Sequence, residues 1–115
     1  GDWSSDVCSS DLFGVKQAGG VLRAQRMLAT AEAAGIPCVI GHGFGLDPST
    51  YIECMVSATS RNVLPGLECV GPLKVVDTVT TTRMDISKGS FTLPDAVGLG
   101  LKLDMVKIEQ YRPAH

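Results

Sequence analysis

The stretch Phe13–Gly45, FGVKQAGGVLRAQRMLATAEAAGIPCVIGHGFG, decides how this chain of 115 residues folds. Apolar side chains recur at steps of three and four between residues 21 and 34, which predicts a half-buried helix. Gly35 favours the left-handed backbone that ends a helix, and Pro37 cannot continue one. The apolar run Pro37–Ile40 then predicts a parallel strand covered on both faces. Together with the apolar residues that open the stretch, these segments predict a βαβ unit.

A second helix and a third strand are expected after this unit. Asp47 followed by Pro48 is typical of a helix start, with Asp47 as the N-cap, and the apolar spacing carries the helix to residues 59–62. Leu67–Val70 is a short apolar run with one charge, which predicts a strand parallel to the preceding one. This part of the chain is therefore expected to hold two consecutive βα units and a strand.

The last third of the chain has a different pattern. Arg83–Ile86 and Ser90–Leu93 flank Ser87-Lys88-Gly89, which predicts a β-hairpin with glycine in its turn. Asp104 is expected to cap a short final helix, Met105–Tyr111.

Residues 1–12, GDWSSDVCSSDL, differ from everything that follows them. They are polar, contain SSD twice and resemble a translated sequencing adapter. We therefore expect them to be a non-native tail without stable contacts, and the native protein to continue upstream of Phe13. The alternative is an ordinary disordered N-terminal tail.

Composition excludes several classes of partner. A net charge of −2 gives no footprint for nucleic acid or an anionic membrane. No run approaches the roughly 18 apolar residues of a membrane helix, and no basic, apolar leader opens the chain. We therefore expect a cytoplasmic protein.

The chain has four cysteines and no C-x-x-C pair, which argues against zinc and thioredoxin-type sites. Cys38 lies in a predicted strand and Cys54 in a predicted helix. Both are expected to be buried structural thiols.

Several short motifs occur together in one order. Their combination resembles the C-terminal end of the enolase superfamily, in the mandelate racemase/muconate lactonizing enzyme branch, from residue 13 to about residue 111. The motifs are K-x-x-G-G at Lys16–Gly20, A-E-A-A-G-I-P at Ala31–Pro37, Gly41-His42-Gly43, L-E-C-V-G-P-L at Leu67–Leu73, G-x-x-x-L-P-D from Gly89 to Asp95, and G-L-G-x-x-L-D at Gly98–Asp104.

The resemblance implies an α/β fold, namely the C-terminal part of a (β/α)7β TIM barrel. This chain would supply the end of the sixth strand through the last strand. Residues 13–82 would be the partial barrel, and residues 83–115 a hairpin and tail that pack on a capping domain absent from this chain.

The resemblance also implies a function. Members abstract the proton α to a carboxylate with the help of Mg²⁺, as racemases, dehydratases or cycloisomerases, and the metal ligands end the third, fourth and fifth strands, which this chain lacks. The chain would be an inactive piece of a homo-oligomeric isomerase or lyase that acts on a small carboxylate such as a hydroxy acid or sugar acid. The alternative is a self-contained α/β binding or interaction domain without catalytic activity.

Three residues are candidates for the site. The family's catalytic Lys or Asp falls on Gly14, so Lys16 is either a base in a shifted register or a solvated lysine. His42 lies one residue after Gly41, which occupies the position of a catalytic His, and is either catalytic, substrate-contacting or structural. Glu68 matches the Glu that ends the eighth strand, where it would donate a hydrogen bond when protonated or orient another group.

Overall fold

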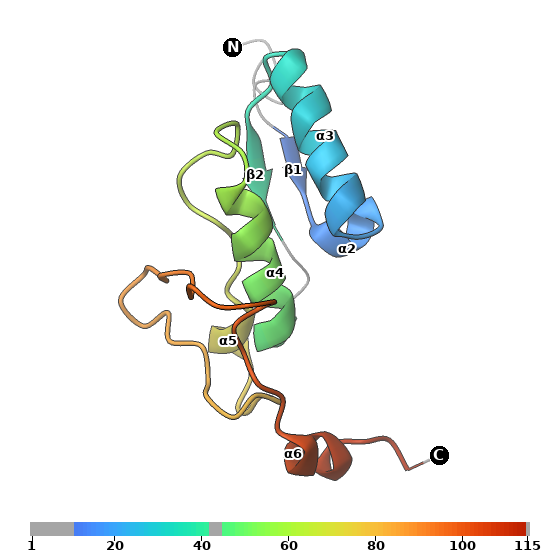
Figure 1. The fold of residues 1–115 in the computed structure, drawn as a ribbon, viewed down its shortest axis with the longest axis vertical. Coiled ribbons are helices and arrows are strands. Elements are labelled where there is room, and N and C mark those ends of the chain that lie inside the picture. The colour runs from blue at the N-terminus through green and yellow to red at the C-terminus, as the bar shows by residue number, and fades with distance from the viewer. Residues whose placement is uncertain (1–10, 42–44, 115) are drawn as a thin grey trace.

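The computed structural model describes residues 11–41 and 45–114. Its strands β1 and β2 pair in parallel, with Leu12 opposite Val39, while α3 runs alongside β1 and α4 alongside β2 (Figure 1). The predicted βαβ unit is confirmed. In chain order the elements are β1 (Asp11–Phe13), α2 (Val15–Ala18), α3 (Val21–Ala33), β2 (Cys38–Ile40), α4 (Asp47–Ala58), α5 (Gly71–Lys74) and α6 (Met105–Gln110).

The start of β1 corrects the expected boundary of the N-terminal tail. Asp11 pairs with Cys38 and Leu12 with Val39. The prediction that residues 1–12 make no stable contacts is therefore wrong for these two residues. A strand is held through its N–H and C=O groups, so a polar composition does not prevent pairing. Residues 1–10 lie outside the described part of the chain.

Helix α3 ends where the sequence predicts. Gly35 has a φ of 70°, and its N–H donates to the carbonyl of Glu32 over 3.0 Å. The N–H of Ile36 closes the turn by donating to the carbonyl of Ala31 over 2.9 Å. Because such a turn satisfies the last carbonyls of a helix, the chain can leave α3 directly into β2.

The core lies between the helices and the strands. From α3 it takes Ala24 and Leu28, which are 0% and 2% exposed. The remaining buried members of this cluster are Val15, Cys38, Ile40, Val56 and Cys69.

The predicted third strand does not form at its predicted bounds, although the chain just before it pairs with β2 in the predicted parallel direction. Leu67–Val70 is not a strand, and the parallel bridge to Cys38 is made by Val63. The N–H of Leu64 donates to the carbonyl of Cys38 over 2.8 Å, and the next bond, from Glu68 N–H to the carbonyl of Ile40, spans 3.1 Å.

A bulge explains this register. In a regular parallel ladder, the N–H of residue 66 would donate to the carbonyl of Ile40. The residue that does so is Glu68, two positions later. Pro65 has no N–H to donate, and Gly66 takes a φ of 97°. The chain therefore bulges by two residues before it returns to β2.

The predicted hairpin is wrong. The turn at Ser87-Lys88-Gly89 forms, since the N–H of Gly89 donates to the carbonyl of Ile86 over 3.0 Å. Within the described residues, however, no ladder joins the two flanking segments. The first flanking segment, Arg83–Ile86, bonds to another part of the chain instead, because the N–H of Met84 donates to Asp47 Oδ2 over 2.6 Å.

The prediction that Asp47 is the N-cap of α4 is wrong. Leu46 takes that position, and Asp47 lies inside the helix with its side chain fully buried. Its Oδ2 accepts from the hydroxyl of Thr80 over 3.2 Å as well as from Met84. Asp47 therefore fastens the start of α4 to the segment around residues 80–84.

Further contacts hold the C-terminal third. Thr80 forms an antiparallel bridge with Leu103. The guanidinium of Arg83 donates to the carbonyls of Pro72, Val75 and Val76, around the end of α5. The predicted final helix is confirmed as α6, with Asp104 Oδ1 accepting from two N–H groups of its first turn.

None of the helices in the described ranges is long and apolar enough to cross a membrane.

Candidate functional site

The carboxyl ends of β1, β2 and the segment after the bulge meet at one edge. Gly14 follows β1 and Gly41 follows β2, and both are buried. A Cβ atom built on Gly14 would lie 3.2 Å from the carbonyl oxygen of Gly41, so the two strand ends approach closely. Glu68 joins the same edge through its bond to Ile40. Functional residues of parallel α/β folds gather at this edge of the sheet.

A second close approach involves Gly45, just before α4. A Cβ atom on Gly71 would overlap the carbonyl group of Gly45. Only glycine at position 71 lets the start of α5 lie against Gly45. The backbone at the entrance to α4 is therefore held by close packing.

The three predicted site residues fall in different places. Glu68 is exposed at the strand edge, next to the buried Cys69. Lys16 is exposed on α2, and Gly14 stands at the strand end before it. His42 lies outside the described residues, in the loop between Gly41 and Gly45. The structure thus brings the backbone of Glu68 to the strand end that precedes His42.

Lys16 lines a cavity of about 650 Å³ between the α2–α3 turn and α4. The same cavity is lined by Gly14, Gly45 and Glu53. Glu53 is 6% exposed, and burial raises the pKa of its carboxyl group, an effect that a hydrogen bond with Cys69 partly offsets.

Sequence reasoning did not single out Glu53. An acidic residue on an amphipathic helix normally indicates the solvent side. The available signal is its spacing, because it lies three positions after Thr50 and three before Val56, and all three are buried. A charged residue on the buried stripe of a helix is a candidate for a functional or paired group.

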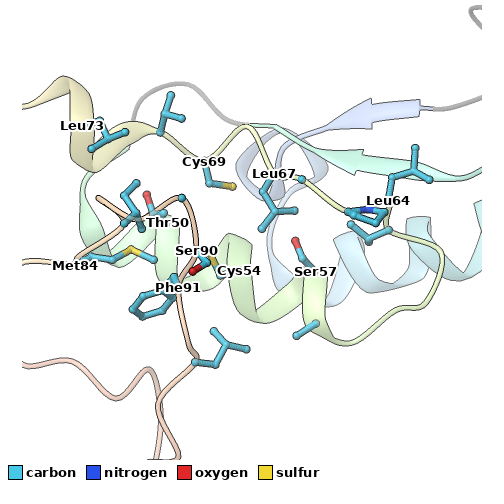
Figure 2. A pocket seen from close by; sticks show the side chains of 18 residues that line it. Thr50, Cys54, Ser57, Leu64, Leu67, Cys69, Leu73, Met84, Ser90 and Phe91 are labelled. Carbon is cyan, nitrogen blue, oxygen red and sulfur yellow. The ribbon is translucent and has the colours of Figure 1, made fainter.

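A second cavity of about 490 Å³ lies on the other side of α4 (Figure 2). Its wall comes from α4, from the segment 63–70 and from the C-terminal chain, including Met84 and Phe91. Phe91 packs edge-on against Tyr51 of α4, with 5.0 Å between ring centroids. The labelled side chains from α4 are Thr50, Cys54 and Ser57, and those from the facing segment include Leu67 and Cys69.

The described residues do not fit a magnesium site. Mg²⁺ is held by convergent carboxylates and other oxygen ligands. Within residues 11–41 and 45–114, no three His, Cys, Asp or Glu side chains gather closely enough to hold a metal ion.

Comparison with known proteins identifies the family. The sequence profile described as enolase C-terminal domain-like matches residues 5–107, so the match begins inside the stretch assigned above to a non-native tail. Muconate cycloisomerase 1-1 of Acinetobacter lwoffii is 36% identical over 107 residues, which is 91% of this chain and 28% of the relative. Chloromuconate cycloisomerase of Cupriavidus pinatubonensis is 31% identical over 105 residues, 90% of this chain and 28% of the relative.

Solved structures give the same result. The muconate lactonizing enzyme from Klebsiella pneumoniae superposes with a TM-score of 0.79 at 28% identity, covering 84% of this chain and 27% of that enzyme. The one from Pseudomonas putida gives 0.78 at 27% identity, covering 87% and 28%. The chain thus spans little more than a quarter of the length of the proteins it matches. From the profile match and the identity to these relatives, the chain belongs to the enolase superfamily, as an enolase C-terminal domain-like sequence.

Proposed function

We propose that this chain forms the last strands of the barrel of a cycloisomerase that acts on muconate or a close analogue. The carrying observation is that the ends of the parallel strands β1 and β2 meet the segment after the bulge, where the N–H of Glu68 donates to the carbonyl of Ile40 and the connection holding His42 begins. The similarity to muconate and chloromuconate cycloisomerases, which runs over nine-tenths of the chain, supports this choice among isomerases and lyases.

In the proposed arrangement, the chain supplies the end of the sixth strand through the last strand. Residues 11–82 belong to the barrel, starting with β1, and residues 83–115 pack on a capping domain. The complete protein is a homo-oligomer. Exposed apolar side chains support this packing, since Val97 and Val106 are 101% and 79% exposed.

The chain's own residues have specific proposed roles at the barrel mouth. Glu68 contacts the dicarboxylate substrate or orients a neighbouring group. His42 exchanges a proton with the reacting carbon framework, since imidazole titrates near neutral pH. Lys16, on α2 beyond the strand end, lies at the rim, where a cation attracts an anionic substrate.

We assign no residue of this chain to magnesium binding. The described residues provide no cluster of ligands, and the family's ligands are expected on strands that precede β1. The reaction therefore needs the chain to be joined to those strands.

A chimera tests the proposal. Residues 11–114 replace the aligned segment of the Acinetobacter lwoffii muconate cycloisomerase, and conversion of muconate to its lactone is measured. We expect a folded chimera to turn over muconate or chloromuconate. Failure of a well-folded chimera on both substrates would contradict the proposed activity.

Two substitutions in the chimera test the residues. Loss of an acid or base at His42→Asn should lower kcat about 10²-fold or more. Glu68→Gln should also lower kcat, whereas Glu32→Gln, on the exposed side of α3, should leave it unchanged. Full activity of His42→Asn would assign His42 a structural role.

A further inference from the structure

The cavity shown in Figure 2 differs chemically from the proposed catalytic edge. Of the 18 described residues that line it, none is Asp, Glu, Lys, Arg or His. The larger cavity beside α2 has both a basic and an acidic side chain in its wall, Lys16 and Glu53. The described residues that line one cavity do not line the other, so the two are separate sites.

Three segments build the uncharged cavity, and each is fastened to the rest of the fold. The first wall is α4. The second wall, residues 63–70, is held to β2 by the N–H of Leu64, which donates to a carbonyl of that strand over 2.8 Å. The third wall is the C-terminal chain, in which the N–H of Met84 donates to Asp47 Oδ2 over 2.6 Å and the ring of Phe91 packs edge-on against α4. The cavity is therefore formed by the fold itself.

The hydroxyl groups that α4 contributes to the wall are already used as donors. The hydroxyl of Thr50 donates to the carbonyl of Leu46 over 3.4 Å. That of Ser57 donates to the carbonyl of Glu53 over 2.7 Å. A charged group that entered the cavity would lose its hydration and find no described side chain of opposite charge, which is costly. The wall thus favours an uncharged ligand.

The apolar part of the wall favours an aromatic ligand. Phe91 supplies a ring, and Met84, Cys54 and Cys69 supply sulfur atoms. Aromatic rings pair favourably in edge-on or offset arrangements, and sulfur packs favourably against a ring edge. The volume of about 490 Å³ lies in the range of cavities that hold small organic ligands.

We propose that this cavity is a binding site for a small, neutral aromatic molecule. The uncharged wall excludes the dicarboxylate proposed as the substrate at the barrel mouth. The site therefore goes beyond the proposed catalytic function and does not depend on it. Leu64 and Leu73, which are 39% and 61% exposed, line the cavity near solvent and would become less exposed when the ligand binds.

The methionines provide the test, because Met84 is the one of the four that lines this cavity. Met27, Met55 and Met105 are internal controls, and Met55 lines a smaller cavity of about 150 Å³ between α3 and α4. The 115-residue chain is labelled with carbon-13 at its methionine methyl groups and titrated with 2-naphthalenemethanol. We expect the ring current of the bound aromatic to shift the Met84 signal, while the other three signals stay in place.

A charged analogue tests the choice of ligand. 2-Naphthoate has the same ring system, but its carboxylate is ionised at neutral pH. It should bind at least about tenfold more weakly than 2-naphthalenemethanol, because its charge would be desolvated without a partner.

Two substitutions narrow the cavity from different walls. Cys54→Phe fills it from α4, and Ser90→Phe fills it from the C-terminal chain, at an exposed position where a larger side chain is tolerated. Each should weaken the binding of 2-naphthalenemethanol at least about tenfold. Leu22→Phe adds the same ring at a side chain of α3 that is 71% exposed, and it should leave the affinity unchanged.

The proposal is wrong if the Met84 signal does not move, or if all four methionine signals move together, as in a loosely packed chain that binds aromatic compounds everywhere. It is also wrong if 2-naphthoate binds as tightly as the alcohol, or if both wall variants bind as tightly as Leu22→Phe. A Met84 signal that changes with protein concentration in the absence of ligand would show that a second copy of the chain covers the cavity, which would equally overturn the proposal.

Discussion

Residues 11–58 and residues 71–114 are held together by different means. The first region has two strands, long helices and an apolar core that includes Leu28 and Ile40. The second has two short helices, and it is fastened by polar contacts such as those of Asp47 and Arg83. The first region therefore depends on the hydrophobic effect, and the second on individual hydrogen bonds whose loss should act locally.

The largest expected effect is in the first region. Leu28 is 2% exposed between α3 and the strands, so Leu28→Ala should destabilise the fold by about 2–5 kcal/mol through a cavity. Amide exchange should lose protection in β1, β2 and α3 together. The control Leu22→Ala, at a side chain 71% exposed, should change little. Equal effects of the two substitutions would contradict the assigned core.

The next effect concerns the junction between the regions. Asp47→Ala leaves the N–H of Met84 without its acceptor, which should cost about 1–3 kcal/mol, while the hydroxyl of Thr80 keeps the carbonyl of Thr82 as a partner. We expect amide exchange to accelerate at Met84 while β2 stays protected. Asp95→Ala, at an exposed position, is the matched control. Uniform loss of protection in both regions would show that they unfold as one unit.

A smaller effect is expected at the end of α5. Arg83→Lys keeps the charge but cannot span three carbonyl oxygens with one ammonium group. Exchange at the amides after α5 should accelerate, with a change of about 1 kcal/mol in local stability. Lys88→Arg in the exposed turn should have no effect. Unchanged exchange in Arg83→Lys would mean that the charge alone is sufficient.

The smallest effect is a pH dependence of α6. Asp77 accepts from Tyr111 over 2.7 Å and from Lys107 over 2.9 Å, and these bonds hold the pKa of its carboxyl group below the usual value. The contribution is therefore present above the unfolded pKa of about 3.9 and is lost as the pH falls through the folded value. Protease cleavage near α6 should increase in acid. Asp77→Asn should remove this pH dependence, and an unchanged profile would exclude Asp77 as its cause.

The two regions also explain which structural features were predictable. The α3 helix and its end at Gly35, like the Asp104 cap, depend on residues within a few positions of each other. Asp47 was misassigned because its acceptor role involves partners 33 and 37 positions away, which no local pattern indicates. The hairpin was wrongly predicted for the same reason, because the N–H of Met84 bonds to Asp47, which is far away in the sequence.

The site shows the same division. The place of Glu68 beside the end of β2 followed from the parallel order of the segments, whereas the bulge that precedes it did not. The burial of Glu53 could not be inferred directly, because it depends on how segments far apart in the sequence pack on α4. Its only trace in the sequence was the three-residue spacing of Thr50, Glu53 and Val56.

The bulge at Pro65–Gly66 has a consequence for side-chain parity. Successive residues of an extended chain face opposite sides, so an insertion of two residues returns the chain to the same alternation. Glu68 is exposed and Cys69 is buried in this phase. Deleting both Pro65 and Gly66 should leave Glu68 exposed and Cys69 buried. Deleting only one of them should bury Glu68 and expose Cys69, which would place a carboxylate against α4. Natural length variation at this point should therefore occur in steps of two.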